Sequence, residues 1–410
     1  MQRDEAKALG ALAGAAAAGI AAQARDVHEG ISERVFKLLG PGGAPVRTIH
    51  DGVTSGAYSA SRALTGAIVK AGAGALSVRH PEDAPPVDRS TVGRLAVGAL
   101  NGIFGDALRR DESVLTLKMS LRRGGADVAL DAFSLAAAFP DATPRLAVFL
   151  HGLCETDDAW KLGAARHVPY GTRLQVERDY TPLYIRYNSG LHVSENGREL
   201  AQLLHQVTRS WPVEVGEIAL IGHSMGGLVA RSACHYDADA GWTDRVRHVF
   251  MLGTPHRGAS LERAANRLGS VLARLPETRG FARPLNIRSA GIKDLRYGYL
   301  TDEDWFGHDA DVYLRRSARE IPFLPTANHY FVCATLSREA DAPLGRMIGD
   351  LLVLHASAWG HGRGERLRFP VDHYRHLGGA NHFDLLNHPA IYEQIKGWLA
   401  RERELASSSA

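Results

Sequence analysis

The hydrophobic pattern of the second part of the chain alternates between strand and helix spacing. Short apolar runs of strand length occur at Leu146–Leu150, Pro182–Tyr187, Glu217–Ile221, Val246–Leu252 and Tyr330–Leu336. Between them lie amphipathic segments such as Ser194–Arg209, whose leucines repeat at helical spacing. Continuous apolar strands that alternate with helices need cover on both faces. The pattern therefore predicts an α/β protein with a mostly parallel sheet covered by helices on both faces.

A different, period-two pattern precedes these runs. In Val114–Leu121, apolar Leu115, Leu117, Met119 and Leu121 alternate with polar residues, which predicts a half-buried strand. Gly124-Gly125 then favours a turn, after which Asp127–Asp131 can pair back as a hairpin.

The first 110 residues have helical spacing only. Proline-containing breaks at Pro41–Pro45 and Pro81–Pro86 separate three apolar helix faces. Those faces are Ile31, Val35, Leu38 and Leu39; then Val46, Ile49, Val53, Leu64 and Ile68; then Val92, Leu95, Leu100, Ile103, Phe104 and Leu108. GxxxG spacings such as Gly98/Gly102 occur about as often as the glycine content gives by chance, so they carry little weight.

Composition separates the same two parts. Residues 1–112 contain 23 alanines and 16 glycines but only Phe36, Tyr58 and Phe104 among 30 aromatic residues, and all six tryptophans lie after residue 159. We therefore expect an Ala/Gly-rich all-helical extension over 1–110, a catalytic domain over 111–403 and a flexible tail over 404–410.

Charge and cysteine content exclude some functions. The formal net charge is only +3 and no basic stripe stands out, which argues against a nucleic-acid partner. Cys154, Cys234 and Cys333 are far apart, so they form neither a disulfide framework nor a CxxC zinc motif. The histidines of 355–388 lack metal-ligand spacing. We expect no metal and no organic cofactor.

The N-terminal apolar run could suggest a membrane segment. Ala8–Ala22 is shorter than the ~20 residues that a spanning helix needs, and Asp4 and Glu5 do not suit a signal peptide. Two interpretations of residues 1–110 stay open: a helical subdomain that packs on the main body, or a peripheral contact with a membrane or lipid surface. We expect a cytoplasmic or peripherally membrane-associated protein rather than a secreted one.

The strongest motif is Gly222–Gly227 (GHSMGG), which joins the apolar run before it to a helical pattern after it. G-x-S-x-G in strand–turn–helix context is typical of a nucleophile elbow, a sharp turn that exposes a serine above the sheet. Ser224 is the candidate nucleophile. Gly222 and Gly226, which lack a Cβ, would let the strand and helix pass close to it. The alternative is a tight structural turn or an inactive enzyme.

An oxyanion formed by attack on a carbonyl needs two N–H donors. The helix that begins at Met225 offers its first backbone N–H, and the loop after Leu146–Leu150 offers that of Leu153, with Gly152 keeping this loop thin. Cys154 is expected to be a small packing residue rather than a second nucleophile.

These motifs make the chain similar to a known family. The matching stretches are VFLHGL (148–153), VSENGRELAQLL (193–204), GHSMGG (222–227), LGTPHRG (252–258), SAGIKDL (289–295) and HFDLLNHP (382–389). They resemble the α/β-hydrolase lipases and esterases, in particular the branch related to GPI-inositol deacylases. The resemblance covers residues 145–402 and does not reach the first 110. It implies the α/β-hydrolase fold and a serine hydrolase.

In that fold the acid and the histidine follow the serine in the order Ser…Asp/Glu…His. His382 matches the family's histidine and lies in a loop, Gly378–His382, before the helical segment Ile391–Ala400. His376 and His388 remain alternatives. His256 is expected to shape its own loop rather than act as the base.

The acid of the set is expected between the serine and the histidine. Asp350 resembles the acid of the family pattern GDG-x-V-P-x-x-S-A, although Leu351 replaces its second glycine and Leu354 its proline. It would orient His382 and stabilise the imidazolium. Asp341 and Asp384 are the alternatives, and Asp384 is expected to anchor the loop of His382.

Residues 260–323 interrupt the rhythm of strands. They contain an amphipathic pattern (Leu261, Ala264, Leu268, Val271, Leu272 and Leu275) and an aromatic cluster over Tyr297–Trp305. In the fold that the resemblance implies, such an insertion covers the site, either as a moving lid or as a static cap.

The expected function is hydrolysis of carboxylic esters, of lipid-like substrates in particular, through an acyl-enzyme on Ser224. Two alternatives stay open: an acyltransferase with the same triad, and a non-catalytic α/β-hydrolase scaffold that binds a partner or a membrane.

Overall fold

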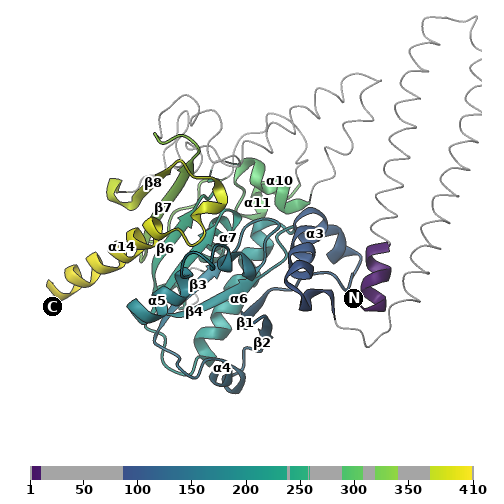
Figure 1. The fold of residues 1–410 in the computed structure, drawn as a ribbon, viewed down its shortest axis with the longest axis horizontal. Helices are drawn as coiled ribbons and strands as arrows, with labels where there is room; N and C mark the ends of the chain where they lie inside the picture. The colour runs from purple at the N-terminus through teal and green to yellow at the C-terminus, as the bar shows by residue number, and fades with distance from the viewer. Residues whose placement is uncertain are drawn as a thin grey trace, which may run out of the picture.

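The core of the molecule is a mostly parallel β-sheet (Figure 1). The computed structural model describes residues 2–10, 86–237, 241–256, 258, 289–307, 319–339 and 370–408. Within these ranges the sheet has the order β2-β1-β4-β3-β5-β6-β7-β8. β1 pairs antiparallel with β2 and with β4, and the remaining neighbours are parallel. The strands are β1 Ser120–Arg123, β2 Ala126–Val128, β3 Arg145–Leu150, β4 Thr181–Arg186, β5 Glu217–His223, β6 Val246–Leu252, β7 Asn328–Thr335 and β8 Tyr374–Gly378.

Helices cover both faces of this sheet. Alternate residues of β3 belong to different apolar clusters, because successive side chains of a strand point to opposite faces. Val148 packs with α4 (Ala132–Ala138), α6 (Val193–Ser210) and α7 (Met225–Tyr236). Phe149 packs with α5 (Tyr170–Arg178) and α14 (Pro389–Ser408). The predicted fold class is confirmed, and the five predicted apolar strands agree with β3 to β7 to within two residues at each end.

The hydrophobic pattern misses β8. This strand lies at the edge of the sheet, and none of its residues is fully buried. An edge strand with one neighbour does not need a continuous apolar run. It still matters for the site, since its last residue, Gly378, leads into the loop of His382.

The last helix of the extension, α3 (Thr91–Arg110), buries a different face from the one predicted. Val92, Leu95 and Ile103 are exposed, and of the predicted apolar face only Leu108 is fully buried. The buried face is made largely of glycine (Gly93, Gly98, Gly102 and Gly105, with Val97, Asn101 and Leu108). The helix therefore packs through close backbone approach rather than through large side chains.

The strand predicted over Val114–Leu121 is also wrong, since β1 begins only at Ser120. Leu115 and Leu117 are buried as expected, but their backbone pairs with a side chain. The Asn101 amide of α3 donates to the Leu115 carbonyl at 2.8 Å and accepts from the Leu117 N–H at 2.9 Å. Asn101 thus satisfies the groups that a neighbouring strand would have paired. The hairpin after Gly124-Gly125 is confirmed as β1–β2, although β2 ends at Val128, before the predicted Asp131.

Little else of the extension belongs to the described residues. Residues 3–10 are helical, and the Glu5 carboxylate accepts the Val87 N–H at 2.9 Å, which ties this helix to the 3-10 turn η2 (Val87–Arg89) before α3. The two helix faces expected between Ile31 and Ile68 lie outside the described part. No helix in that part is long and apolar enough to cross a membrane.

Part of the insertion over 260–323 is described, and it packs on α6 and α7. Its elements are α10 (Ala290–Tyr297) and α11 (Asp302–Trp305). Trp305 stacks on His192 with ring centroids 3.7 Å apart, and the Ser232 hydroxyl donates to the Leu300 carbonyl at 2.6 Å. The aromatic cluster is therefore an anchor for this segment. The amphipathic stretch from Leu261 to Leu275 lies outside the described residues.

Candidate active site

Ser224 occupies a strained backbone position between β5 and α7. Its φ of 53° and ψ of −120° are unusual for a residue with a side chain, and its N–H donates to the Leu252 carbonyl of β6 at 2.7 Å. A Cβ on Gly222 would lie 2.4 Å from the Gly227 nitrogen, and one on Gly226 would lie 2.3 Å from the Leu150 carbonyl oxygen. The turn therefore has room for a side chain at Ser224 but not at these two glycines.

The loop after β3 is held by His151. The ring of His151 is fully buried and its Nε2 accepts the Tyr187 N–H at 3.2 Å, so the proton of the neutral ring is on Nδ1. Nδ1 therefore donates to the Gly152 carbonyl at 2.8 Å, and burial lowers the pKa of His151, which favours this neutral form. Because the Gly152–Leu153 peptide is planar and trans, the Leu153 N–H points away from that carbonyl.

Two backbone amides near Ser224 have no acceptor among the described residues. They are the N–H groups of Leu153 and Met225. Met225 is the first residue of α7, where helical N–H groups have no partner within the helix and the helix dipole is positive. A Cβ on Gly152 would lie 3.1 Å from the Ser224 Cβ, so this loop lies directly against Ser224. This arrangement can hold a negatively charged oxygen.

His382 lies beside the same turn. It is 2% exposed and is the first residue of the 3-10 turn η6 (His382–Leu385). Its ring is 4.7 Å from that of His223, the residue before Ser224, and a Cβ on Gly253 would lie 2.9 Å from its Cε1. The ends of β5 and β6 therefore hold His382 near Ser224, although the two residues are 158 positions apart in the sequence.

The loop of His382 is fixed by a reciprocal pair. The Asn381 N–H donates to the Asp384 carboxylate at 2.8 Å, and the Asp384 N–H donates to the Asn381 side-chain oxygen at 3.2 Å. Asp384 thus anchors the loop, as expected from the sequence. Asp350 and Asp341 lie outside the described residues, so the acid of the triad stays a prediction.

The other candidate histidines are held by their own elements. His376 on β8 bonds to the Thr335 hydroxyl at 2.7 Å, and His388 accepts the Ala390 N–H at 3.2 Å at the start of α14. His256 bonds to the Arg231 guanidinium at 3.2 Å; its burial, with Arg231 close by, holds its pKa well below the ordinary value. Among the described histidines after Ser224, His382 is the one that contacts His223.

Cys154 follows the two loop residues just described. Burial, with the carboxylate of Glu155 beside it, raises the pKa of its thiol to about 11. Its sulfur packs against α3, since a Cβ on Gly102 would lie 2.3 Å from it. A protonated, packed thiol fits the expectation of a small packing residue.

One residue at the site was not found from the sequence. Glu155 accepts the Gly152 N–H at 2.6 Å and lies 3.1 Å from Nδ1 of His223. Burial raises the pKa of its carboxyl, but His223 and the Gly152 N–H outweigh burial and lower it overall. Glu155 belongs to no motif that the sequence singles out, and its only signal is an acidic residue close behind His151-Gly152.

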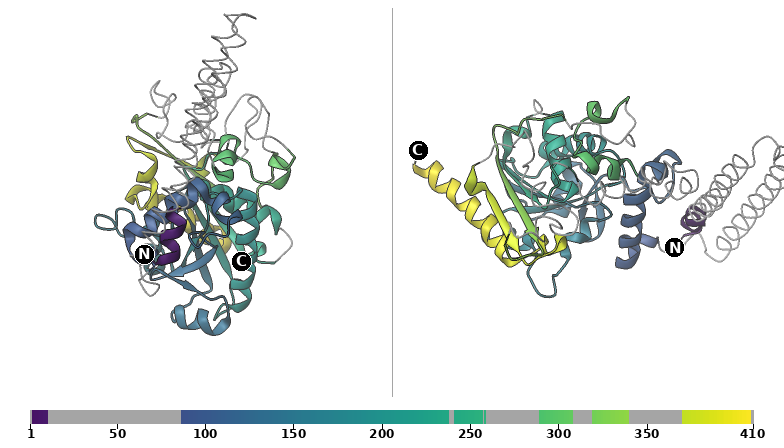
Figure 2. Two further views of the ribbon diagram at one scale, coloured as in Figure 1. Left: turned by 90° about the vertical axis from the view of Figure 1, so that its right-hand side faces the viewer. Right: turned by 90° about the horizontal axis from the view of Figure 1, so that it is seen from above.

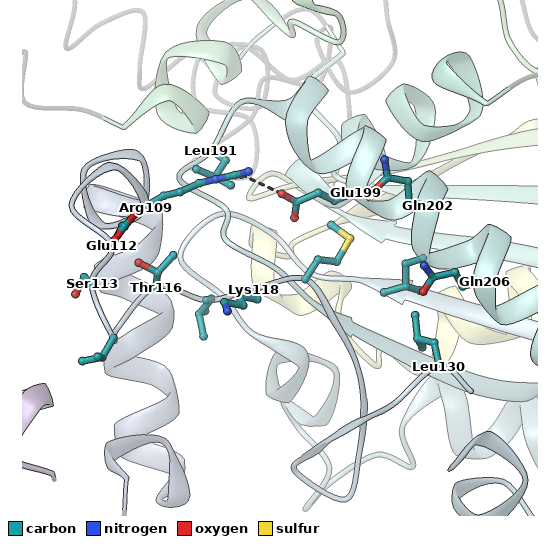
Figure 3. A pocket seen from close by; sticks show the side chains of 14 residues that line it. Arg109, Glu112, Ser113, Thr116, Lys118, Leu130, Leu191, Glu199, Gln202 and Gln206 are labelled. Carbon is teal, nitrogen blue, oxygen red and sulfur yellow. Dashed lines mark hydrogen bonds and ion pairs between the residues drawn. The ribbon is translucent and has the colours of Figure 1, made fainter. Parts of the chain in front are cut away.

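A cavity of about 930 Å³ lies elsewhere, between α3, the segment before β1 and α6 (Figure 3). Arg109 and Glu199 form an ion pair across it at 3.0 Å, and burial raises the pKa of Glu199 despite this pairing. Neither Ser224 nor His382 lines this cavity, and no histidine or aspartate does. Its chemistry therefore does not match that of the elbow. In the described part of the chain, no three metal-ligating side chains converge.

The sheet and the strand–serine–helix turn define the α/β-hydrolase fold. Residues 166–317 match the family model described as PGAP1-like alpha/beta domain, so the chain is similar to that family over this stretch. This match agrees with the resemblance to the GPI-inositol deacylase branch. The comparison with curated protein sequences finds no match.

Several solved structures are also similar to the chain, all with TM-scores below 0.5. The mature lipase BlEst2 of Bacillus licheniformis has a TM-score of 0.40 at 18% identity, over 62% of this chain and 91% of its own. The product of gene lin2722 of Listeria innocua has a TM-score of 0.34 at 13% identity, over 62% of this chain and 93% of its own. The phospholipase PlaB of Legionella pneumophila has a TM-score of 0.32 at 15% identity, over 53% of this chain and 46% of its own.

Proposed function

We propose that the protein is a serine hydrolase of carboxylic esters whose acyl or alcohol part is lipid-like. One observation carries the proposal. Ser224 stands in a strained turn with φ 53° and ψ −120°, close to a buried histidine and to two amides that have no acceptor within the described ranges. A serine hydroxyl is a poor nucleophile unless a base takes its proton, and this arrangement supports the assignment of a base and an oxyanion site to one hydroxyl.

Each residue then has a defined step. The Ser224 Oγ forms a bond to the carbonyl carbon while His382 takes its proton, and the Leu153 and Met225 N–H groups hold the oxyanion. The tetrahedral intermediate expels the alcohol, which receives the proton from His382, and leaves an acyl-enzyme. Water attacks the acyl group by the same route, and Ser224 recovers its proton from His382. Asp350 is the proposed acid that orients His382.

An apolar group beside His382 supports a lipid-like substrate. Phe383 follows His382 directly and is 47% exposed, so an apolar ring is accessible next to a buried catalytic candidate. Its ring lies 5.9 Å from that of His382. An acyl chain or an apolar alcohol could therefore cover Phe383 when the ester carbonyl is at Ser224. The PGAP1-like family match supports the same class of reaction.

A fluorophosphonate probe tests the nucleophile. We expect it to label the wild type and the control Ser134→Ala, in α4, but not Ser224→Ala. An unlabelled wild type, or full labelling of Ser224→Ala, would contradict the proposal. A series of p-nitrophenyl esters tests the substrate class. We expect kcat/KM to rise with acyl-chain length, and a maximum at acetate would contradict a lipid-like acyl part.

A further inference from the structure

Behind the nucleophile, Glu155 and His223 connect three parts of the candidate site. The ring of His223 is completely buried. Its Nδ1 lies 3.1 Å from the Glu155 carboxylate, and its Nε2 lies 3.2 Å from the carbonyl oxygen of His382. The same carboxylate accepts the Gly152 N–H at 2.6 Å. His223 precedes Ser224, and Gly152 precedes the oxyanion donor Leu153.

The hydrogen-bond partners, together with the lowered pKa of Glu155, indicate the protonation of this pair. A backbone carbonyl can only accept, so Nε2 of His223 carries a hydrogen. An ionised carboxylate also only accepts, so Nδ1 carries a second hydrogen and the ring is an imidazolium. The lowered pKa of Glu155 is consistent with an ionised carboxylate despite its burial. Glu155 and His223 therefore form a buried ion pair in which both ring hydrogens are used.

We propose that Glu155 and His223 are positioning residues for the reaction at Ser224, an inference that rests on the proposed function. The Glu155 carboxylate holds the peptide before Leu153, and so fixes the oxyanion donor. The His223 imidazolium holds the backbone of His382, and so fixes the base. One proton shared by the pair therefore holds both the oxyanion donor and the base in position around the nucleophile.

The proton on His223 should then be needed for turnover. Around the pair lie His151, Cys154, Tyr187 and His382. The pKa of His151 is lowered by burial, and those of Cys154 and Tyr187 are raised by burial, so these three are neutral near neutral pH. When rising pH removes a proton from His223, its ring can no longer donate to both partners. Activity should therefore fall on the alkaline side, in addition to the acid-side loss from protonating the base.

Two substitutions of Glu155 separate charge from hydrogen bonding. In Glu155→Gln, the amide oxygen can still accept the Gly152 N–H, and the amide nitrogen can donate to a neutral His223 that keeps its bond to His382. We expect kcat within about 3-fold of wild type and no alkaline loss over roughly pH 6 to 10. Glu155→Leu can do neither. We expect it to lower kcat by about 10- to 100-fold, with KM changed by no more than a few-fold.

The chain offers a matched control at the other end of β5. Glu217 is a partly buried carboxylate that lies 3.2 Å from Nε2 of His248, far from the elbow. We expect Glu217→Gln to keep the wild-type kcat and its alkaline loss. Rates are divided by the number of serines that the fluorophosphonate probe labels, so that misfolded protein does not enter kcat.

Opposite results are easily told apart. A wild-type kcat per labelled serine in Glu155→Leu, or a wild-type alkaline loss in Glu155→Gln, would overturn the positioning role. In both cases the wild type is labelled and active, so the proposed function stands. An unlabelled wild type would instead remove the proposed function, and the positioning role with it.

Discussion

Gly102 of α3 is in direct contact with Cys154 of the loop after β3. A Cβ on Gly102 would lie 2.3 Å from the Cys154 sulfur and 2.7 Å from its backbone nitrogen. One turn earlier, a Cβ on Gly98 would lie 2.7 Å from a methyl group of Thr156. In the right-hand view of Figure 2, α3 and α14 lie at opposite ends, with the sheet between them. The last helix of the extension thus supports the loop that carries Leu153.

Gly102→Val should damage both stability and activity. The new side chain would clash with the backbone of Cys154. A backbone cannot move aside as a flexible side chain can, so α3 or the loop must shift. We expect the free energy of unfolding to fall by about 1–3 kcal/mol. We also expect kcat on a soluble ester to fall, because the Leu153 N–H moves. Urea unfolding and steady-state kinetics measure the two effects.

The control for this prediction lies on the same helix. Leu95 is 52% exposed, so Leu95→Ala should change the free energy of unfolding by no more than about 0.5 kcal/mol. Normal stability and kcat in Gly102→Val would show that α3 does not support the loop.

Ser224→Gly should stabilise the fold while it abolishes turnover. Glycine adopts a φ of 53° without the steric cost that a Cβ incurs, so the strain at the turn is released. We expect a gain of about 1 kcal/mol over Ser224→Ala, which keeps the Cβ and is equally inactive. Thermal unfolding of the two variants checks the difference, and equal Tm values would argue against strain at this residue.

Cys154→Ala should remain active. The thiol has a pKa of about 11 and packs on Gly102, so it is neither ionised nor exposed as a nucleophile near neutral pH. We expect kcat within about 3-fold of wild type, with a loss of stability of about 1 kcal/mol from the missing sulfur. A folded variant with kcat lowered more than about 100-fold would instead place the thiol in the reaction.

Acid should destabilise the fold through His329. Burial, with Arg231 and His373 nearby, lowers the pKa of His329 from 6.5 to about 3. Below pH 6.5 the unfolded chain therefore binds a proton that the folded chain does not, and stability falls by up to about 1.4 kcal/mol per pH unit until the pH nears the folded value. His256 has a lowered pKa as well and adds to the same trend.

His329→Gln removes one of these titrating groups. Its free energy of unfolding, measured in urea at several pH values between roughly 6.5 and 4, should depend less steeply on pH than that of the wild type. Parallel curves for the two proteins would contradict the assignment. His167→Gln, at an exposed position, serves as the control for the histidine-to-glutamine change itself.

Whether the hydrophobic pattern predicts an element depends on how that element is stabilised. β3 to β7 are buried on both faces, so their continuous apolar runs were visible in the sequence. The pattern does not predict β8, because an edge strand does not need a continuous apolar run. It wrongly predicts a strand at Leu115 and Leu117, because the Asn101 side chain, and not a neighbouring strand, pairs with their backbone. α3 was misread for a similar reason, since its glycines pack without apolar side chains.

The sequence by itself determined the order of the elements and the nucleophile candidate, because a serine between two glycines at a strand–helix junction is a local constraint. It could also point to His382 through the family resemblance. Only the tertiary structure decided that Glu155, His223 and the His382 carbonyl meet behind Ser224, and that α3 lies against the Cys154 loop. These contacts join residues far apart in the chain, and their burial depends on the packing of several elements at once.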